Sequence, residues 1–450
     1  MERLIPILFL IACPVVSQAA RSITLDVSFP YYQERSDESI VEEIRANDFG
    51  DIRLISAKPP LVEAFKEANI QTWLLTFMNG AYSTAGLPDG WKNWQMKLSK
   101  PAKPDGFTYF CCNNPAYRKW KRDQLVEALS ASEYYGVDLV EPYFPGYPDP
   151  TADIYGCLCD HCVAAFKKMY PEMKGPPDFS DPKSPRYWKT DKALYERWVG
   201  FRVASVVSYL DEIVNGAEGI RDKCPKIKIS TWSLAVDIPN QIAKLRESEG
   251  LDAAAIVKRV KPDMHVVQTH WPDWMKPGLS AKYPLKYKPV VDSIKEVTPL
   301  LPIMLQADIG SRVEMRRSRS WLNDLEKRAR EAGFESVTSY EYSIGNYMYT
   351  EAPKVVKVEA EPDGLKLVFN KRLDATTASN LSNYSVNTGR VDYAKVDGNT
   401  VRLSISGADG EIEVTISGLT DDESRRLYHD KPARKIEDNT RVSLTEELDE

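Results

Sequence analysis

An alternation of short apolar segments with longer amphipathic ones constrains the fold more than any other feature of this chain. The longer segments carry apolar residues at helical spacing, as at Val203, Val206, Val207 and Leu210. They include the expected helices Ser36–Ala46, Pro115–Tyr134 and Leu194–Gly219. The apolar segments predict eight strands, at Ile23–Phe29, Asp51–Ala57, Ile70–Phe77, Val137–Tyr143, Ile227–Leu234, Met264–His270, Ile303–Asp308 and Ser336–Tyr342.

Strands that alternate with helices form a parallel sheet, and eight such units favour a closed TIM (β/α)8 barrel. An open doubly wound sheet is the alternative. Such a sheet normally carries a glycine-rich phosphate turn after its first strand, and none follows Phe29. We therefore expect an α/β barrel over residues 21–352.

The chain changes character near Pro353. From Lys354 onward, short runs of alternating apolar and polar residues are separated by turn sequences such as Pro362-Asp363-Gly364. This pattern predicts a small all-β sandwich over residues 353–420, similar to the immunoglobulin-like modules of bacterial surface proteins. The segment 421–450 is charged and poor in large apolar residues, so we expect a mostly exposed tail there.

Residues 1–20 combine one Arg, a continuous apolar run and small residues at the end, which is typical of a secretion signal. Cleavage after Ser17-Gln18-Ala19 predicts a periplasmic or secreted protein. Alternatively, Leu10-Ile11-Ala12-Cys13 resembles a lipoprotein box, and Cys13 would then carry a lipid anchor to the outer membrane. The mild net charge of −6 argues against nucleic acid as a partner.

Cysteines are concentrated at two places. Cys157, Cys159 and Cys162 follow the fourth expected strand, and Cys111 and Cys112 follow the third. Because consecutive loops of a barrel are neighbours, these thiols can converge on a structural zinc ion, with Cys112 (or Cys111) as the fourth ligand. Disulfides that also involve Cys224 are the alternative for an exported protein.

These cysteines belong to a longer pattern. Cys112-Asn113-Asn114-Pro115-Ala116-Tyr117-Arg118 opens a helix, Glu141 lies in the fourth strand, and residues 157–166 read CLCDHCVAAF. The order resembles the family 42 β-galactosidases, and the resemblance implies a zinc held by four cysteines and an acid/base role for Glu141. Two positions depart from the family. Val140 replaces the Asn that precedes its acid/base residue, and Gln306 stands where its nucleophilic Glu should be.

Glycoside hydrolysis requires a protonated carboxyl group and an ionised one, and barrel enzymes carry both at the carboxyl ends of strands. Among Glu141, Asp237, Asp308 and Glu341, we predict Glu141 as the acid, because Pro142, Tyr143 and Phe144 should raise its pKa. Its partner is predicted to be Glu341, which Tyr340 flanks, or else Asp308. Asp26 is a weaker candidate. No cofactor is expected for catalysis.

Aromatic and basic residues near the same strand ends suggest how a glycan is held. Trp232, His270, Trp271 and Trp274 are predicted to contact sugar rings, although Trp232 also fits the core, and Gln306 and Tyr340 are predicted to bind the substrate as well. Basic loops suggest a sulfated or uronic glycan bound by Arg316 among others, and ordinary solvation is the alternative. They contain Lys92, Lys97, Lys100, Lys103, Lys276, Lys282, Lys286, Lys288, Arg312, Arg316, Arg317 and Arg319.

Together these patterns predict an exported glycoside hydrolase of poly- or oligosaccharides. Val140 and Gln306 support a different hypothesis, a non-catalytic glycan-binding or surface protein on a decayed glycosidase barrel. A lyase acting on sugars from the same face is a third possibility.

Overall fold

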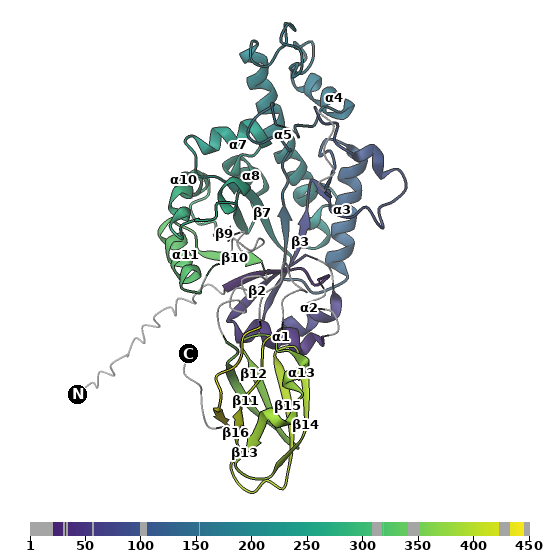
Figure 1. The fold of residues 1–450 in the computed structure, drawn as a ribbon. Coiled ribbons are helices and arrows are strands. Elements are labelled where there is room, and N and C mark those ends of the chain that lie inside the picture. Colours follow the sequence, from purple (N-terminus) through teal and green to yellow (C-terminus); the bar gives the residue numbers. More distant parts are fainter. Residues whose placement is uncertain are drawn as a thin grey trace, which may run out of the picture.

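The computed structural model describes residues 21–29, 32, 35–55, 58–99, 106–152, 154–307, 317, 319–340, 352–422 and 433–444. Its larger part is a closed barrel of parallel strands, in the order β1-β10-β9-β8-β7-β6-β3-β2 (Figure 1). The strands are β1 (Arg21–Leu25), β2 (Phe49–Leu54), β3 (Gln71–Phe77), β6 (Gly136–Val140), β7 (Lys228–Ala235), β8 (Met264–Thr269), β9 (Ile303–Ala307) and β10 (Ser336–Tyr340). All eight expected strands are present, which confirms the predicted (β/α)8 barrel.

Helices connect the strands and cover the outside of the barrel (Figure 1). They include α1 (Asp37–Ala46), α2 (Pro59–Glu67), α3 (Pro115–Ser130), α5 (Lys192–Asn215), α7 (Gln241–Glu249), α8 (Ala253–Val260), α10 (Lys288–Val297) and α11 (Arg319–Glu331). Caps fix where they begin: the Ser36 side chain accepts a hydrogen bond from the Ser39 backbone N–H, and Asn114 accepts from Ala116 and Tyr117. Within the described residues, no helix combines the length and the apolar character needed to cross a membrane.

Two connections at the carboxyl ends of strands are much longer than the others. After β3 the chain forms a small hairpin of β4 (Gly80–Ala81) and β5 (Thr108–Tyr109). After β6 it makes a long loop, then α4 (Asp160–Met169), and returns through the 24-residue helix α5. Because both connections rise from the same face of the barrel, they form walls around the mouth of the barrel.

A charged network fills the lower barrel. The Arg53 Nη1 lies 2.9 Å from both carboxylate oxygens of Asp138, and the Arg53 Nε lies 2.9 Å from Asp51 Oδ1. The ring of Trp73 packs against the guanidinium at 4.3 Å. Above this network lies a buried apolar layer formed by Leu75, Val140, Trp232, Val266 and Met304. The barrel is therefore a packed core, and a ligand can enter only above this layer.

The C-terminal module consists of two antiparallel sheets, as the sequence predicted. One has the order β11-β12-β15-β14 and the other β13-β16-β17. The strands are β11 (Val355–Glu361), β12 (Gly364–Phe369), β13 (Tyr384–Val386), β14 (Arg390–Asp397), β15 (Thr400–Ser406), β16 (Glu413–Ile416) and β17 (Thr440–Ser443). The predicted exposed tail was wrong for β17, which pairs with β16 and buries Val442. Only one of the four side chains of β17 is buried, so the sequence lacks the alternation of apolar and polar residues from which a strand is recognised.

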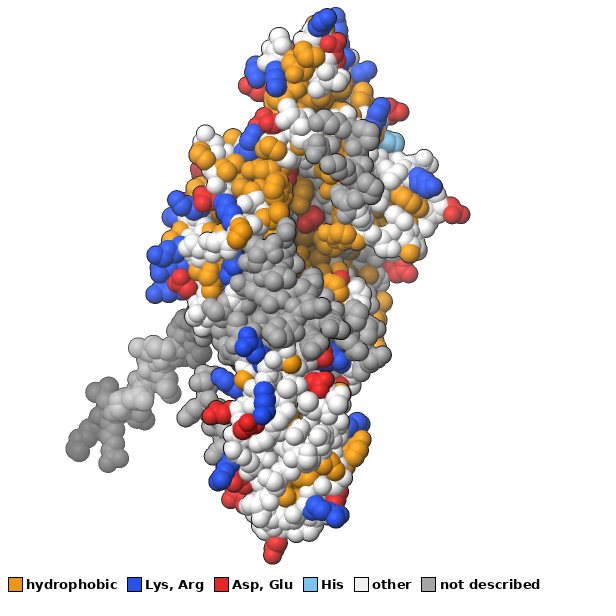
Figure 2. Space-filling model, viewed as in Figure 1, with side chains coloured by type: hydrophobic (Ala, Val, Ile, Leu, Met, Phe, Trp, Pro, Cys, Tyr) orange, Lys and Arg blue, Asp and Glu red, His pale blue; other side chains and the backbone are white. Residues whose placement is uncertain are grey.

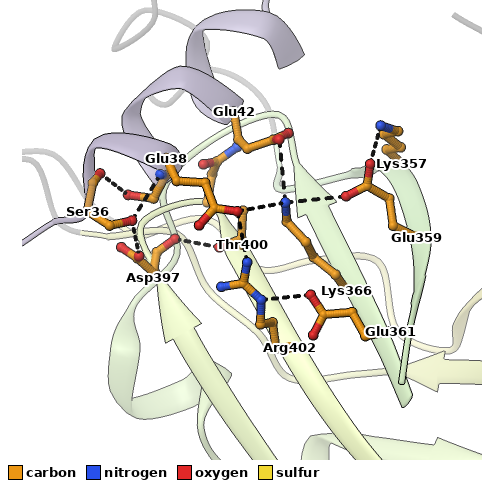
Figure 3. Close-up of polar contacts among 12 residues, drawn as sticks. Ser36, Glu38, Glu42, Lys357, Glu359, Glu361, Lys366, Asp397, Thr400 and Arg402 are labelled. Atoms are coloured by element: carbon orange, nitrogen blue, oxygen red, sulfur yellow. Dashed lines mark hydrogen bonds and ion pairs between the residues drawn. The ribbon is translucent and has the colours of Figure 1, made fainter. Parts of the chain in front are cut away.

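The module contacts the barrel through α1, below the strands in Figure 1. Figure 3 shows the polar contacts at this junction. The Lys366 ammonium lies 3.4 Å from Glu42 and 3.3 Å from Glu359, and Arg402 lies 3.0 Å from Glu38 and 2.8 Å from Glu361. Because Lys366 is only 5% exposed, this junction is a packed interface and not a pair of tethered domains.

Candidate active site

Glu141 follows β6 directly and so lies at the carboxyl-terminal face of the barrel, where barrel enzymes carry their chemistry. Its φ is +52°, in the left-handed region that residues other than glycine rarely adopt. Such strain persists only where the surrounding structure imposes it, and it is frequent at functional sites. The side chain is partly exposed, and its Oε1 accepts a hydrogen bond of 3.4 Å from Gln268 Nε2.

Tyr143 lies near enough to two carboxylates to be affected by their charges: Glu141, and Glu249 at the end of α7. Burial, followed by the negative charges of Glu141 and Glu249, raises the pKa of Tyr143 well above its usual value, so the phenol stays protonated. The Asn79 amide donates to the Tyr143 carbonyl at 2.8 Å and fixes the backbone here. Sequence reasoning missed Glu249. Its place at a helix C-terminus, where a carboxylate opposes the helix dipole, is a signal that could have found it.

A pocket of about 570 Å³ opens beside Tyr143, between the loop after β6 and the start of α9 (Trp271–Trp274). Figure 2 shows this face of the molecule, with a hollow in the barrel part that hydrophobic side chains line and in which an acidic side chain is visible. The pocket is lined by Tyr109, Tyr143, Pro145, Gly146, Tyr147, Pro148, Thr151, Ala152, Ile154, Glu249, His270 and Trp271. A lining that is mostly aromatic and apolar, with a small number of polar groups, is typical of a site for a small molecule.

The predicted sugar-contacting residues His270 and Trp271 both line this pocket. Trp271 is 46% exposed and lies edge-on to Tyr147, with 5.9 Å between ring centroids. Trp274, at the other end of α9, is half-buried and does not line the pocket. Asp273 anchors the short helix, because it is buried and accepts hydrogen bonds of 2.7 Å from Tyr287 Oη and from the Asp237 backbone N–H.

Trp232 does not contribute to this surface, so its predicted contact with sugar was wrong. The side chain is 1% exposed within the barrel, and its Nε1 donates to Asp138 Oδ1 at 3.0 Å. The physical reason is its position: Trp232 lies in the middle of β7, three residues before the strand ends at Ala235. Its alternative assignment to the core is correct.

Gln306 occupies the inner side of β9, two residues beyond the core residue Met304, and pairs in register with Gln268 of β8. The side chain is completely buried, and both of its amide atoms lack a hydrogen-bond partner among the described residues. Tyr340 closes β10 and is half-buried. The other predicted residues near these strands, Asp308, Glu341 and Arg316, lie outside the described residues.

Four cysteines converge above the loop after β6. The sulfur atoms of Cys111, Cys157, Cys159 and Cys162 all lie within 4.8 Å of one another, and none of the four forms a disulfide with another described cysteine. The Cys111 and Cys162 sulfurs are 3.4 Å apart, close to the roughly 3.8 Å edge of a tetrahedron with zinc–sulfur bonds of about 2.3 Å. The Asn113 backbone N–H also donates to Cys111 Sγ. This donor set can hold a metal ion.

The fourth cysteine of the cluster is Cys111, so the prediction of Cys112 was wrong and its stated alternative is correct. Cys111 opens a turn that the Asn114 backbone N–H closes by donating to the Cys111 carbonyl at 3.0 Å, and in this turn only the Cys111 side chain faces the three cysteines of the next loop. Cys112 is buried away from the cluster, and burial raises the pKa of its thiol to about 12. It is therefore a protonated core residue.

Arg202 of α5 is another functional residue that the sequence did not reveal. It is completely buried, and its guanidinium donates to the carbonyls of Glu247, Ser248 and Gly156 at 2.7, 2.8 and 3.1 Å. The ring of Tyr155 stacks against it at 4.6 Å. Arg202 thus ties the end of α7, which carries Glu249, to the loop that leads into the cysteine cluster.

Several of the basic side chains expected to bind an anionic glycan have partners within the protein. Lys276 lies 2.6 Å from Asp273, and Lys288 lies 2.5 Å from Asp292. Arg317 donates to the Pro277 carbonyl at 3.1 Å. Each of these three cations therefore already has a polar partner within the protein.

The sequence matches no family model and no curated protein. Its fold, however, is similar to solved barrels. The glycoside hydrolase domain of PgaB (BpsB) from Bordetella bronchiseptica has a TM-score of 0.52 and 13% identity, over 71% of this chain and 93% of that one. A catalytic mutant of Gan42B, a GH42 β-galactosidase from G. stearothermophilus, has a TM-score of 0.51 and 14% identity, over 71% of this chain and 50% of that one.

This chain therefore corresponds to almost the whole PgaB domain but to only half of the β-galactosidase. At these identities the likeness concerns the fold alone. The chain has the barrel fold of glycoside hydrolases, followed by two small antiparallel sheets.

Proposed function

We propose that the protein is an exported glycoside hydrolase that cleaves a poly- or oligosaccharide, with Glu141 as the general acid. The observation that carries this proposal is the position of Glu141: a partly exposed carboxyl group on a strained backbone at the carboxyl end of β6, near an aromatic pocket. The fold similarity to glycoside hydrolase barrels supports it.

In this mechanism the Glu141 carboxyl protonates the glycosidic oxygen as the bond to the anomeric carbon breaks. Gln268 orients the carboxyl group through its amide, which donates a hydrogen bond and cannot itself take the acid's proton. As that bond breaks and the protonated leaving group departs as an alcohol, a second, ionised carboxylate attacks the anomeric carbon, or takes a proton from the water molecule that attacks it. Glu341 is our first candidate for this role and Asp308 the second, because they directly follow the last residues of β10 and β9 in the chain.

A Glu141→Gln variant tests the assignment. Loss of the acid should reduce hydrolysis of a polysaccharide by about 10²–10⁴-fold. In a 2,4-dinitrophenyl glycoside of the same sugar, the leaving group is a phenolate that departs without being protonated. Hydrolysis of this substrate by the variant should therefore fall far less. Glu172→Gln, at an exposed surface position, is the control and should hydrolyse both substrates at the wild-type rate. Equal loss on both substrates would contradict the role of acid.

A glycan-binding protein without turnover is the second candidate, and Gln306 favours it. An amide at this position of β9 cannot form a glycosyl ester, and Val140 is buried in the core layer. Binding of a glycan by the wild-type protein without any release of product, over the same substrates, would select this candidate.

We also propose that the cysteine cluster holds a structural zinc ion. Cys111, Cys157, Cys159 and Cys162 supply four sulfur donors, the ligand set of closed structural zinc sites. When bound, zinc would fasten the hairpin after β3 to the long loop after β6. It would take no part in glycosidic bond cleavage.

A further inference from the structure

One carboxylate oxygen of Glu249, at the pocket, lacks a hydrogen-bond partner among the residues that the structure describes. The side chain is only 3% exposed, and its Oε2 finds no hydrogen-bond donor among the described residues. Leaving a buried carboxylate oxygen unpaired costs free energy, and such a group in a native protein requires an explanation. Because Glu249 also lines the pocket, a ligand with a hydrogen-bond donor can supply the missing partner.

His270 lies beside the Glu249 carboxylate. The backbone N–H of Trp271 donates to His270 Nδ1 at 2.9 Å, so a neutral imidazole must carry its proton on Nε2. That Nε2 lies 3.2 Å from Glu249 Oε1. This contact lacks hydrogen-bond geometry, so among the described residues both His270 Nε2 and Glu249 Oε2 are left without a hydrogen-bond partner beside the pocket.

The walls of the pocket suit a sugar ring. Tyr147 packs edge-on against both His270 and Trp271, at 4.6 and 5.9 Å between ring centroids. Trp271 leaves nearly half of its surface exposed at the rim, where it can stack on the apolar face of a pyranose. The residues found to line the pocket include a carboxylate and no Lys or Arg.

The backbone around Glu249 is held from two sides. The Phe144 backbone N–H donates to the Glu249 carbonyl at 3.0 Å, and Arg202 binds the carbonyls of Glu247 and Ser248. The first bond joins the end of α7 to the loop that carries Tyr147, and the bonds of Arg202 join it to α5. The carboxylate is thus preorganised, which reduces the entropy lost when a ligand binds.

We propose that this pocket is a subsite for an uncharged sugar ring, in which Glu249 Oε2 accepts a hydrogen bond from a ring hydroxyl. The proposal deepens the proposed function by naming a substrate class. A uronate or sulfate group placed in this pocket would face the carboxylate with no cation among the lining residues, so anionic rings are excluded from it.

A binding experiment tests the subsite apart from catalysis. A microarray of neutral hexose oligosaccharides and their uronic and sulfated counterparts is probed with the wild-type protein, Glu249→Gln and Trp271→Ala. Titration calorimetry then measures the affinity of each protein for the neutral oligosaccharide that binds most tightly on the array. Glu247→Gln is the matched control, because it makes the same chemical change on α7 where the side chain bonds to Tyr195 and Lys244 outside the pocket.

We expect binding to uncharged oligosaccharides, a loss of affinity of about tenfold or more in Glu249→Gln, and wild-type affinity in Glu247→Gln. Trp271 is exposed, so Trp271→Ala should fold normally and also bind more weakly. Circular dichroism melting verifies the fold of each variant. Wild-type affinity in both pocket variants, binding only to anionic oligosaccharides, or no binding to any of them would overturn the subsite.

Failure of the subsite and failure of the proposed function are distinguishable. If binding follows the expected pattern but no bound oligosaccharide is cleaved, the hydrolase proposal fails and the subsite stands. If cleavage depends on Glu141 but both pocket variants bind as the wild type does, the subsite fails and the hydrolase stands.

Discussion

Two neighbouring cysteines show how strongly function depends on the individual residue. Cys111 and Cys112 are identical in chemistry and adjacent in sequence, but only Cys111 faces Cys157, Cys159 and Cys162. The other thiol is sealed in the core, where burial raises its pKa to about 12. Geometry therefore separates the two cysteines, because only the Cys111 sulfur lies close enough to the other three to complete a four-sulfur site.

At this scale we predict that Cys111→Ser abolishes zinc binding and Cys112→Ser does not. Elemental analysis of the purified variants measures the zinc content. The zinc-free variant should also lose about 4 kcal/mol of stability in conditions where free zinc exceeds its Kd by about 1,000-fold. The prediction fails if the two variants retain zinc equally, or if Cys112→Ser is the one that loses it.

Among the elements, helix α5 both covers the barrel and connects the candidate active site to the cysteine cluster. Its buried Arg202 reaches the end of α7 and the loop before the cysteine cluster, and it binds three carbonyl oxygens at once. A planar guanidinium with several fixed donors suits this task, and a lysine ammonium at the same place would leave carbonyls unpaired. Helix α5 thereby holds the candidate active site and the cysteine cluster in one arrangement.

We predict that Arg202→Lys lowers the free energy of unfolding by about 2–4 kcal/mol, because buried hydrogen bonds to a charged group are lost. Denaturation in urea measures the change. Arg197→Lys on the same helix is the control: the Arg197 side chain is 41% exposed and pairs with Glu172, so its substitution should change stability by less than about 1 kcal/mol. Similar losses in the two variants would refute the role of Arg202.

At the scale of the whole molecule, the C-terminal module and the barrel form one packed body. The module is joined through Lys366 and Arg402, whose partners Glu38 and Glu42 belong to α1 (Figure 3). Desolvation by burial lowers the pKa of Lys366, but the neighbouring carboxylates Glu42, Glu359 and Glu38 outweigh it and raise the pKa above its usual value. The ammonium therefore stays charged at the junction.

We predict that Lys366→Met weakens this junction by about 1–2 kcal/mol after allowance for solvent screening, since the facing carboxylates lose their shared cation. Differential scanning calorimetry should show one unfolding transition for the wild type and a broadened or divided transition for the variant. Lys357→Met is the control, because Lys357 is exposed and also pairs with Glu359. A single, unshifted transition in Lys366→Met would show that the junction does not couple the two parts.

The sequence by itself determined the order of elements. Eight apolar segments predicted the eight barrel strands, and the change of periodicity near Pro353 predicted the all-β module, because both patterns follow from which side of each element is buried. It also indicated Glu141 at the end of β6, and His270 and Trp271 at the end of β8, since strand ends share one face of a barrel.

Only the tertiary structure decided which side chains face one another. It selected Cys111 over Cys112, placed Trp232 in the core, brought Glu249 from a helix end into the pocket, and added β17 to the module. These outcomes depend on side-chain direction and on contacts between segments distant in the chain. Local periodicity records how much of a residue is buried and carries no information about which partner buries it.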